Sequence, residues 1–416
     1  MNSKLVRTET FSKGKYVDGA PIIIYGAGAC GLLTLEGLRL IGLTADFFVD
    51  KTHANGKVKE IEIIPPAKLT NFPEAHILIA SSNFFEDMLN YLVAIGHKKY
   101  YNVQSLISNE QLLAGKSLEE QFDLQNLIIT YKYTAAYKHC SNRTILSTLD
   151  IVITEKCNMR CRDCANAMQY YAKPKNCDIL LLKESLDRFL NCVDYLPKAF
   201  VIGGEPFLNS ELHRVLDWYG EHPKIGSIWI FTNGSIIPNR RNLDAMKRAK
   251  VMVRLSDYGP LVKNLQKFEE CMQREQILYR RYVCDIWHDL GSMRDRGYGP
   301  EKIRNVYSAC ECRDIFTLLN GRLYRCPWSA HGDNLGIIRH RPGDYVDLMD
   351  HSQSDELTAD KIRRFTEECE QIAACGYCNG RGPSTASVPA AIQMKKPCNI
   401  KELYYDEPAD VPLRSS

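Results

Sequence analysis

The run C-N-M-R-C-R-D-C occupies residues 157–164 and closely follows the apolar stretch 145–153, which reads as a buried strand. Three thiolates at the spacing CxxxCxxC bind three corners of a 4Fe–4S cube and leave the fourth iron without a protein ligand. A cluster that only passes electrons normally has four cysteine ligands, so the open iron predicts a coordination site for a substrate or cofactor. Cys157, Cys161 and Cys164 are therefore the first candidate site residues.

The segments around this run alternate between strand and helix signals. Strands are expected at 145–153, 199–202, 227–231, 251–255 and 277–283, and helices near 180–195, 210–221, 240–249 and 261–275. A series of βα units of this length predicts a partial (β/α)6 barrel, whose chemistry lies at the carboxyl ends of its strands. We place the barrel at 146–300 and expect a small metal-binding domain at 301–416, where the alternation stops and cysteines accumulate.

A second motif, Gly203-Gly204-Glu205-Pro206, follows the strand expected at 199–202. Its two glycines let a backbone edge approach a ligand closely, and the proline fixes the exit of the chain. Polar residues also end the third and fourth expected strands, at Asn233 and Ser256. A helix cap or a turn is the alternative role for each of these two.

The cysteine run, its place after a barrel strand and the Gly-Gly-Glu-Pro motif resemble the radical S-adenosylmethionine superfamily. The resemblance implies that the open iron binds the amino and carboxylate groups of S-adenosylmethionine and that the glycine edge and Glu205 meet its ammonium group. It further implies that Asn233 and Ser256 hold the ribose or carboxylate of this cofactor. The family usually has an aromatic residue before the third cysteine, whereas this chain has Asp163. A zinc knuckle or buried thiols would be the alternative reading of the cysteines.

Further cysteines crowd the last quarter of the chain, among them Cys310, Cys312, Cys326, Cys375, Cys378 and Cys398, and the first five are candidate metal ligands. Together with Gly321 they resemble the twitch or SPASM extensions of the same superfamily, which carry auxiliary 4Fe–4S clusters. The resemblance implies one cluster, held by Cys310 or Cys312 and by Cys326, Cys375 and Cys378. Only Cys398 follows the final CxxC, which favours the single-cluster twitch form. A structural zinc site is the alternative.

Near the N-terminus, Gly26-x-Gly28-x-x-Gly31 follows a strand, opens a helix and is followed by Asp50 at the end of the next strand. This is the Rossmann fingerprint in its required context, and it predicts a Rossmann-like domain at 20–105. The domain is short and resembles those of polysaccharide-biosynthesis proteins and sugar acyltransferases. A nucleotide or nucleotide-sugar ligand, a scaffolding role and a nicotinamide dehydrogenase all stay open.

The rest of the chain narrows the class of protein. We expect a flexible arm at 1–19 and a helical linker at 106–145. The net charge is +3, from 53 Lys and Arg against 50 Asp and Glu, which gives no reason to expect a nucleic-acid or membrane-surface partner. No apolar run has the length of a signal peptide or a membrane helix. Sixteen cysteines without an export signal indicate metal or thiol chemistry in a reducing, cytoplasmic setting.

These features predict a radical S-adenosylmethionine enzyme, an oxidoreductase or epimerase that takes hydrogen from a carbohydrate or nucleotide-sugar substrate. Its 5′-deoxyadenosyl radical would draw on an external electron donor such as flavodoxin or ferredoxin. The sugar part is an analogy drawn from the N-terminal domain. One rival is a maturase of a ribosomal peptide, which predicts a winged-helix segment near the N-terminus. Another is a non-catalytic iron–sulfur electron carrier, which would need no open iron. Substrate identity and oligomeric state are left open.

Overall fold

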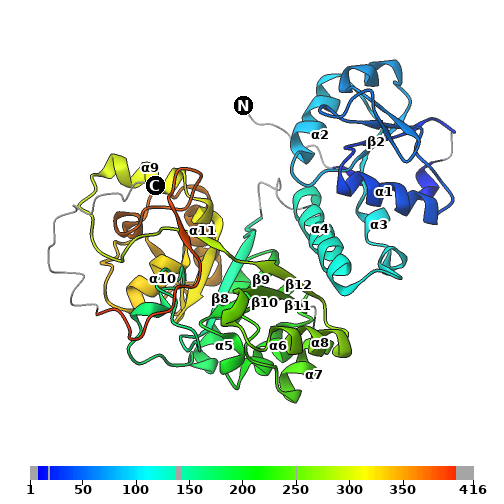
Figure 1. Cartoon of the computed structure of the whole chain (residues 1–416). Coiled ribbons are helices and arrows are strands. Elements are labelled where there is room, and N and C mark those ends of the chain that lie inside the picture. Colours follow the sequence, from blue (N-terminus) through cyan, green and yellow to red (C-terminus); the bar gives the residue numbers. More distant parts are fainter. Residues whose placement is uncertain (1–7, 17–18, 137–142, 250, 400–416) are drawn as a thin grey trace, which may run out of the picture. The chain divides into compact units, whose positions relative to one another are not determined.

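The computed structural model describes residues 8–16, 19–136, 143–249 and 251–399. The chain divides after Arg143 into two compact units. Each unit is built around its own largely parallel sheet with helices packed on it (Figure 1). No helix within the described residues is long and apolar enough to cross a membrane.

The described residues of the first unit form a seven-stranded sheet in the order β1-β7-β6-β2-β3-β5-β4. Its strands are β1 (Glu9–Thr10), β2 (Ile22–Tyr25), β3 (Phe47–Val49), β4 (Lys57–Val58), β5 (Ile61–Ile64), β6 (His76–Ile79) and β7 (Tyr100–Asn102). Its helices are α1 (Ala29–Leu40), α2 (Phe85–Ala94), α3 (Gln104–Ile107) and α4 (Leu118–Ala136). From β5 to β7 the strands run parallel in the order of a dinucleotide-binding fold, so the predicted Rossmann-like architecture is confirmed.

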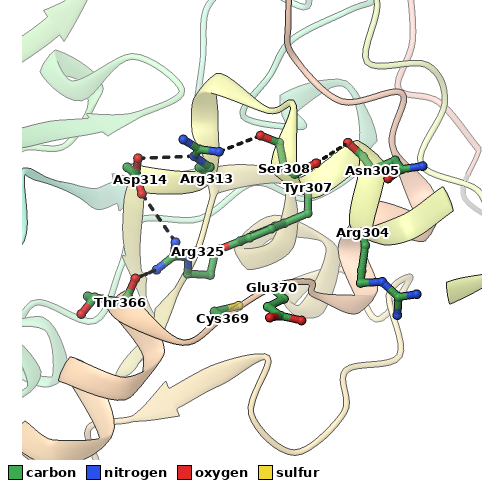
Figure 2. Close-up of a pocket in the computed structure, with 10 residues that line it drawn as sticks. All are labelled: Arg304, Asn305, Tyr307, Ser308, Arg313, Asp314, Arg325, Thr366, Cys369 and Glu370. Atoms are coloured by element: carbon green, nitrogen blue, oxygen red, sulfur yellow. Dashed lines mark hydrogen bonds and ion pairs between the residues drawn. The ribbon is translucent and has the colours of Figure 1, made fainter. Parts of the chain in front are cut away.

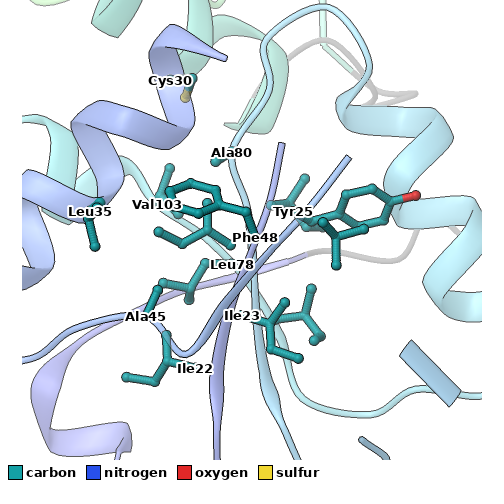
Figure 3. Packing of buried hydrophobic residues seen from close by; sticks show 14 of the residues in the cluster. Ile22, Ile23, Tyr25, Cys30, Leu35, Ala45, Phe48, Leu78, Ala80 and Val103 are labelled. Carbon is teal, nitrogen blue, oxygen red and sulfur yellow. The ribbon is translucent and has the colours of Figure 1, made fainter. Parts of the chain in front are cut away.

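The strand β2 forms the centre of this sheet because all four of its residues are apolar and buried. Ile23 pairs in register with Phe47 of β3 on one side and with Ile77 of β6 on the other. Side chains from both faces of β2 pack with Phe48 and Leu78 in the core (Figure 3). A strand covered on both faces reads as a continuous apolar run, which is why it could be located from the sequence.

The flexible arm expected at 1–19 is wrong for residues 8–16. There β1 pairs parallel with β7 at the edge of the sheet. Phe11 is 0% exposed, and its ring lies 5.6 Å from that of Tyr101. One buried aromatic side chain and a short edge strand are enough to dock this polar segment, and neither gives a periodic signal in the sequence.

The described residues of the second unit form an eight-stranded sheet in the order β12-β11-β10-β9-β8-β14-β15-β16, and β13 pairs with β17. The strands are β8 (Thr148–Thr154), β9 (Leu196–Gly203), β10 (Ile225–Thr232), β11 (Val251–Asp257), β12 (Tyr279–Val283), β13 (Ile286–His288), β14 (Phe316–Leu319), β15 (Arg322–Tyr324), β16 (Tyr345–Asp347) and β17 (Ser387–Pro389). The helices are α5 (Ile179–Cys192), α6 (Leu212–Tyr219), α7 (Arg240–Arg248), α8 (Leu265–Glu275), α9 (Pro300–Ser308), α10 (Pro327–Asn334) and α11 (Asp355–Glu367).

The strands β8 to β12 run parallel in chain order, and the helices α5 to α8 alternate with them, so the predicted open, partial barrel is confirmed. The sixth parallel strand, β14, does not extend the series beyond β12. It pairs with the first strand, β8, and is followed by the antiparallel β15 and β16. The expected boundary at residue 300 therefore does not separate two sheets, because the C-terminal part pairs with the otherwise open edge of β8.

The inner face of this sheet is partly covered by the C-terminal part of the chain. Val152 of β8 and Ile202 of β9 belong to the same buried cluster as Tyr324 of β15 and Ala330 of α10. Since side chains alternate along a strand, the residues at even positions of β8 and β9 share this inner face. The predicted site residues of the barrel lie at one edge of the sheet, which is formed by the carboxyl ends of β8 to β11.

Replacing Tyr131 with Phe should lower the free energy of unfolding of the first unit by about 1–3 kcal/mol. The hydroxyl of this buried side chain donates to the carbonyl of Ile79 at 2.5 Å and accepts from the N–H of Val103 at 2.9 Å. Both backbone groups would lose their partner inside the core. Denaturant unfolding of the variant measures the effect, with Tyr16→Phe as the matched control at a half-buried tyrosine. Equal stability of both variants would contradict this account.

Candidate active site

The three cysteines of the first motif lie together on the loop that follows β8. Burial is the main cause that raises the pKa of Cys157 to about 12, and the nearby thiols of Cys164 and Cys161 add to it. Burial likewise raises the pKa of Cys161 to about 11, with a smaller contribution from Cys164. Thiols in this state are neutral at physiological pH and become thiolates when a metal replaces their protons.

Two of the three sulfurs accept a hydrogen bond from a side-chain amide: Gln393 donates to Cys161 at 3.1 Å, and Asn233 donates to Cys157 at 4.0 Å. The backbone N–H groups of Asn166 and Met168 lower the pKa of Cys164, against the larger effect of burial. Donors of this kind stabilise thiolates and surround the ligands of iron–sulfur clusters. The donor set therefore fits the three-cysteine 4Fe–4S cluster that the spacing predicts.

The Gly-Gly-Glu-Pro turn is bonded to the start of the same loop. The N–H of Gly204 donates to the carbonyl of Thr154 at 2.9 Å, and the N–H of Glu205 donates to that of Lys156 at 2.8 Å. A Cβ atom on Gly203 would lie 2.1 Å from the Thr154 oxygen, and one on Gly204 would lie 2.1 Å from the Lys156 oxygen. Both positions need glycine because the backbone leading into the cysteine loop passes directly against them.

The side chain of Glu205 points into the protein. It is 0% exposed, and its carboxylate accepts from the hydroxyl of Thr232 at 2.8 Å and from the N–H of Asn233 at 2.9 Å. Burial raises its pKa to about 7 in spite of these donors. The carboxylate therefore binds the end of β10, where donors needed an acceptor. That Glu205 meets the ammonium of a cofactor stays a prediction.

Asn233 and Ser256 lie at the ends of the adjacent strands β10 and β11. The side-chain amide of Asn233 donates to the side-chain oxygen of Asn158, in the cysteine loop, at 3.0 Å and lies 4.0 Å from the sulfur of Cys157. Ser256 pairs in register with Tyr282 of β12. The structure thus brings both predicted residues to the edge that carries the cysteine loop.

Tyr258 adds an aromatic side chain at this edge. Its hydroxyl bonds with Ser256, and its pKa is raised by burial first and then by the neighbouring thiols of Cys284 and Cys164. The ring packs edge-on against Trp287 at 5.7 Å between centroids. An aromatic surface therefore lies beside the cysteine loop although Asp163 replaces the aromatic residue of the family pattern.

The C-terminal cysteines form a second group. Burial raises the pKa of Cys326 to about 12 and that of Cys378 to about 11, and Cys310 contributes to both shifts. The pKa of Cys375 is also raised, by burial first and then by Cys326, Cys378 and Cys310. Cys312 shares a hydrogen bond with Cys310. Cys310 is thus the one of this pair that interacts with all three other thiols.

Neither the cysteine triplet nor this second group has the placement of a site for one metal ion. Among the described residues, no three His, Cys, Asp or Glu side chains are placed closely enough to hold a single metal ion. Two sulfurs of the group accept N–H donors, since Gly380 donates to Cys378 at 3.3 Å and Ser329 donates to Cys326 at 3.5 Å.

In the first unit, the turn that contains Gly26, Gly28 and Gly31 has the conformation of a Rossmann turn. Gly26 has a φ of +116°, and a Cβ atom on Gly31 would lie 1.9 Å from the carbonyl oxygen of Gly26. A Cβ atom on Gly28 would have nothing within 4 Å. Packing therefore accounts for Gly26 and Gly31 but not for Gly28. Asp50 accepts from the N–H of Ala27 at 3.1 Å, so its carboxylate is bonded to the turn itself.

A surface pocket of about 510 Å³ is lined by residues of α9, of the segment before β14 and of the end of α11 (Figure 2). Asp314, in its lining, precedes β14 and its carbonyl accepts from the hydroxyl of Ser147, which places the pocket near the amino end of β8. Its buried Arg325 is already bound to Asp314 at 3.6 Å and to the carbonyl of Phe365 at 2.8 Å. The pocket is separate from the candidate active site.

Two residues of the site could not be found from the sequence. Gln393, which bonds to Cys161, is 232 positions away from it and belongs to no motif. Arg254 lies on β11 two positions before Ser256, and its guanidinium lies 5.1 Å from the ring centre of Phe231 and 4.5 Å from that of Tyr282. The only sign of Arg254 in the sequence was its place two positions before Ser256, which puts both side chains on the same face of the strand.

Comparison with known proteins gives no match to a family model. Curated relatives include GTP 3′,8-cyclase of Clostridium acetobutylicum, 27% identical over 154 residues, which are 33% of this chain and 45% of the relative. GTP 3′,8-cyclase 1 of Mycobacterium tuberculosis is 28% identical over 142 residues, 32% of this chain and 37% of the relative. The chain thus spans less than half the length of these relatives.

Solved structures with a similar arrangement include BtrN in complex with AdoMet and 2-DOIA, with a TM-score of 0.39, 14% identity and coverage of 56% of this chain and 93% of that one. Native anSMEcpe with AdoMet and the Cp18Cys peptide has a TM-score of 0.36 and 14% identity, over 57% of this chain and 88% of that one. The similarity to the cyclases agrees with the superfamily resemblance that rests on the cysteine triplet and on the Gly-Gly-Glu-Pro motif. Over about a third of its length, the chain is thus similar to curated GTP 3′,8-cyclases.

Proposed function

We propose that this enzyme uses S-adenosylmethionine and a cluster on Cys157, Cys161 and Cys164 to abstract hydrogen from an anionic, sugar-containing substrate such as a nucleotide-sugar. The observation that carries the proposal is the cysteine loop, in which side-chain amides donate to the sulfurs of Cys157 and Cys161 and the turn at Gly203 and Gly204 is bonded to the start of the loop. Oxidation or epimerisation of the substrate is the expected outcome.

When bound, the cluster and S-adenosylmethionine supply the 5′-deoxyadenosyl radical that characterises the superfamily. The residues of this chain then have distinct tasks. The glycine edge and Asn233 orient the cofactor beside the loop, while buried Glu205 keeps the ends of β9 and β10 together. Tyr258 offers an aromatic surface for the adenine.

The anionic character of the substrate is inferred from Arg254. Within the described part of the chain, no carboxylate forms an ion pair with its guanidinium, which instead lies over two aromatic rings. Arg254 lies two positions before Ser256 on β11, so its Cα is about 7 Å further from the carboxyl end of the strand and its side chain lies on the same face. A guanidinium in this position suits a phosphate or carboxylate group in bidentate fashion.

The glycine turn of the first unit supports a nucleotide-containing ligand. Gly28 begins α1 as its N-cap, and the space beside its Cα is open. The helix N-terminus there would favour a phosphate. The rival peptide maturase calls for a winged helix near the N-terminus, whereas the described residues of the first unit form a parallel sheet.

The second cysteine group is proposed to hold an auxiliary 4Fe–4S cluster through Cys310, Cys326, Cys375 and Cys378. Since four thiolates would leave no iron open, such a cluster would exchange electrons rather than bind substrate. It could accept the electron that a substrate radical loses on oxidation, while the proton leaves to solvent or a base. An external donor such as flavodoxin or ferredoxin would supply the electron for cofactor cleavage.

Anaerobically reconstituted and reduced protein should cleave S-adenosylmethionine into 5′-deoxyadenosine and methionine, measured by chromatography. Cys157→Ala should abolish the product because two thiolates cannot hold a cluster with one open iron in place. Cys30→Ala, a buried cysteine of the first unit, is the matched control and should retain the activity. Absence of 5′-deoxyadenosine from fully loaded wild-type protein would refute the proposed function.

Iron analysis should give about eight iron atoms per chain, since two 4Fe–4S clusters are expected. Cys375→Ala should remove about four of them and leave the formation of 5′-deoxyadenosine intact. A wild-type content of about four iron atoms with one zinc would instead assign the second group to zinc.

With UDP-glucose as the probe, cleavage of S-adenosylmethionine should accelerate, whereas neutral glucose should have no effect. Arg254→Gln should raise the UDP-glucose concentration needed for half-maximal stimulation by about 10–100-fold, because the anion would lose a charge-assisted hydrogen-bonding partner. Arg254→Lys should recover part of the loss, and Arg248→Gln serves as the control at an exposed arginine. Equal stimulation by glucose would argue against an anionic substrate.

A further inference from the structure

The C-terminal segment Ala391–Cys398 runs alongside the cysteine loop although it is far from it in sequence. The N–H of Arg162 donates to the carbonyl of Ile392 at 2.8 Å, and the N–H of Met394 donates to the carbonyl of Arg160 at 2.8 Å. These two bonds flank an antiparallel bridge at Cys161. The segment therefore acts as a short partner strand for the loop that carries the cluster ligands.

The side chain of Gln393 uses both ends of its amide in this contact. Its oxygen accepts from the N–H of Arg160 at 2.9 Å. Its nitrogen donates to the sulfur of Cys161 at 3.1 Å and to the carbonyl of Ala391 at 2.7 Å. A backbone N–H can only donate, so the amide oxygen must face Arg160 and the amide nitrogen must face the sulfur. The orientation of the group is thus fixed by its partners.

A donor at this position acts on the charge of the cluster. Reduction adds one negative charge, part of which resides on the cysteine sulfurs. A hydrogen bond to sulfur is therefore stronger in the reduced than in the oxidised form, and it raises the reduction potential. Cys161 is 8% exposed, so water competes little for this sulfur.

We propose that Gln393 is a positioning residue for the radical-generating cluster: its side-chain amide holds the Cys161 sulfur and raises the reduction potential of the cluster. The inference rests on the proposed function in so far as the cluster is the one on Cys157, Cys161 and Cys164. It adds to the site the C-terminal segment, which lies outside the Cys157–Cys164 and Gly203–Pro206 motifs.

The test is a reductive titration of anaerobically reconstituted full-length protein, followed by electron paramagnetic resonance. The signal that changes on adding S-adenosylmethionine belongs to the cluster with the open iron. Gln393→Leu removes the donor and should shift the midpoint of this signal to a more negative potential. Gln393→Glu keeps an acceptor for Arg160, so the loop stays bonded, but it lacks the donor and adds a charge; its shift should be larger.

Lys396→Leu, at an exposed side chain on the same segment, is the control and should titrate like the wild type. The signal of the auxiliary cluster should not move in any variant. Equal midpoints for wild type, Gln393→Leu and Gln393→Glu would overturn the inference. A lower iron content of Gln393→Leu does not affect the comparison, because a midpoint potential does not depend on the fraction of protein that carries the cluster.

The two proposals fail in different ways. If wild-type protein forms 5′-deoxyadenosine but the midpoints agree, only the role of Gln393 is refuted. If the midpoints differ but no protein cleaves S-adenosylmethionine, the cluster contact stands and the proposed function does not.

Discussion

The N–H groups of Gly204 and Glu205 donate to the carbonyl oxygens of Thr154 and Lys156, and the candidate site is organised around these two bonds. The loop after β8 has little regular structure of its own, so its cysteines need an external template. The end of β9 is this template. Its backbone can approach the loop so closely only because Gly203 and Gly204 have no Cβ atom. The carboxylate of Glu205 accepts from the N–H of Asn233, which directly follows β10. The side-chain amide of Asn233 donates to Asn158 in the cysteine loop. Three strand ends are thereby joined into one rigid edge.

Local patterns in the sequence were sufficient for much of this fold. The apolar run of β2, the glycines of its turn and the strands β8 to β12 lie close to where their residues predict them, because burial on one or both faces leaves a visible period. The cysteine triplet was equally plain, since ligand spacing is a local property. The second cysteine group could also be named from its spacing, whereas the sequence alone left open whether Cys310 or Cys312 is a ligand.

What could not be predicted depends on contacts between distant segments. Nothing in β14 specifies that it pairs with β8 rather than with β12, because a short apolar strand fits either edge. The orientation of the Glu205 carboxylate follows from donors on β10 that no motif of the sequence places beside it. Gln393 has no periodic or compositional mark at all. The docking of residues 8–16 was missed for the same reason, since it depends chiefly on the single side chain of Phe11.

The pairing of β14 with β8, together with the position of Gln393, has a consequence for the order of events during synthesis. The cysteine triplet leaves the ribosome long before the strand that covers the edge of β8, and Gln393 follows Cys161 by 232 residues. At typical rates of translation this interval is roughly 10–50 s. During that time the thiols have no partner strand beside their loop and the sheet edge is unpaired. Iron can therefore enter a fully formed site only after Gln393 has been synthesised.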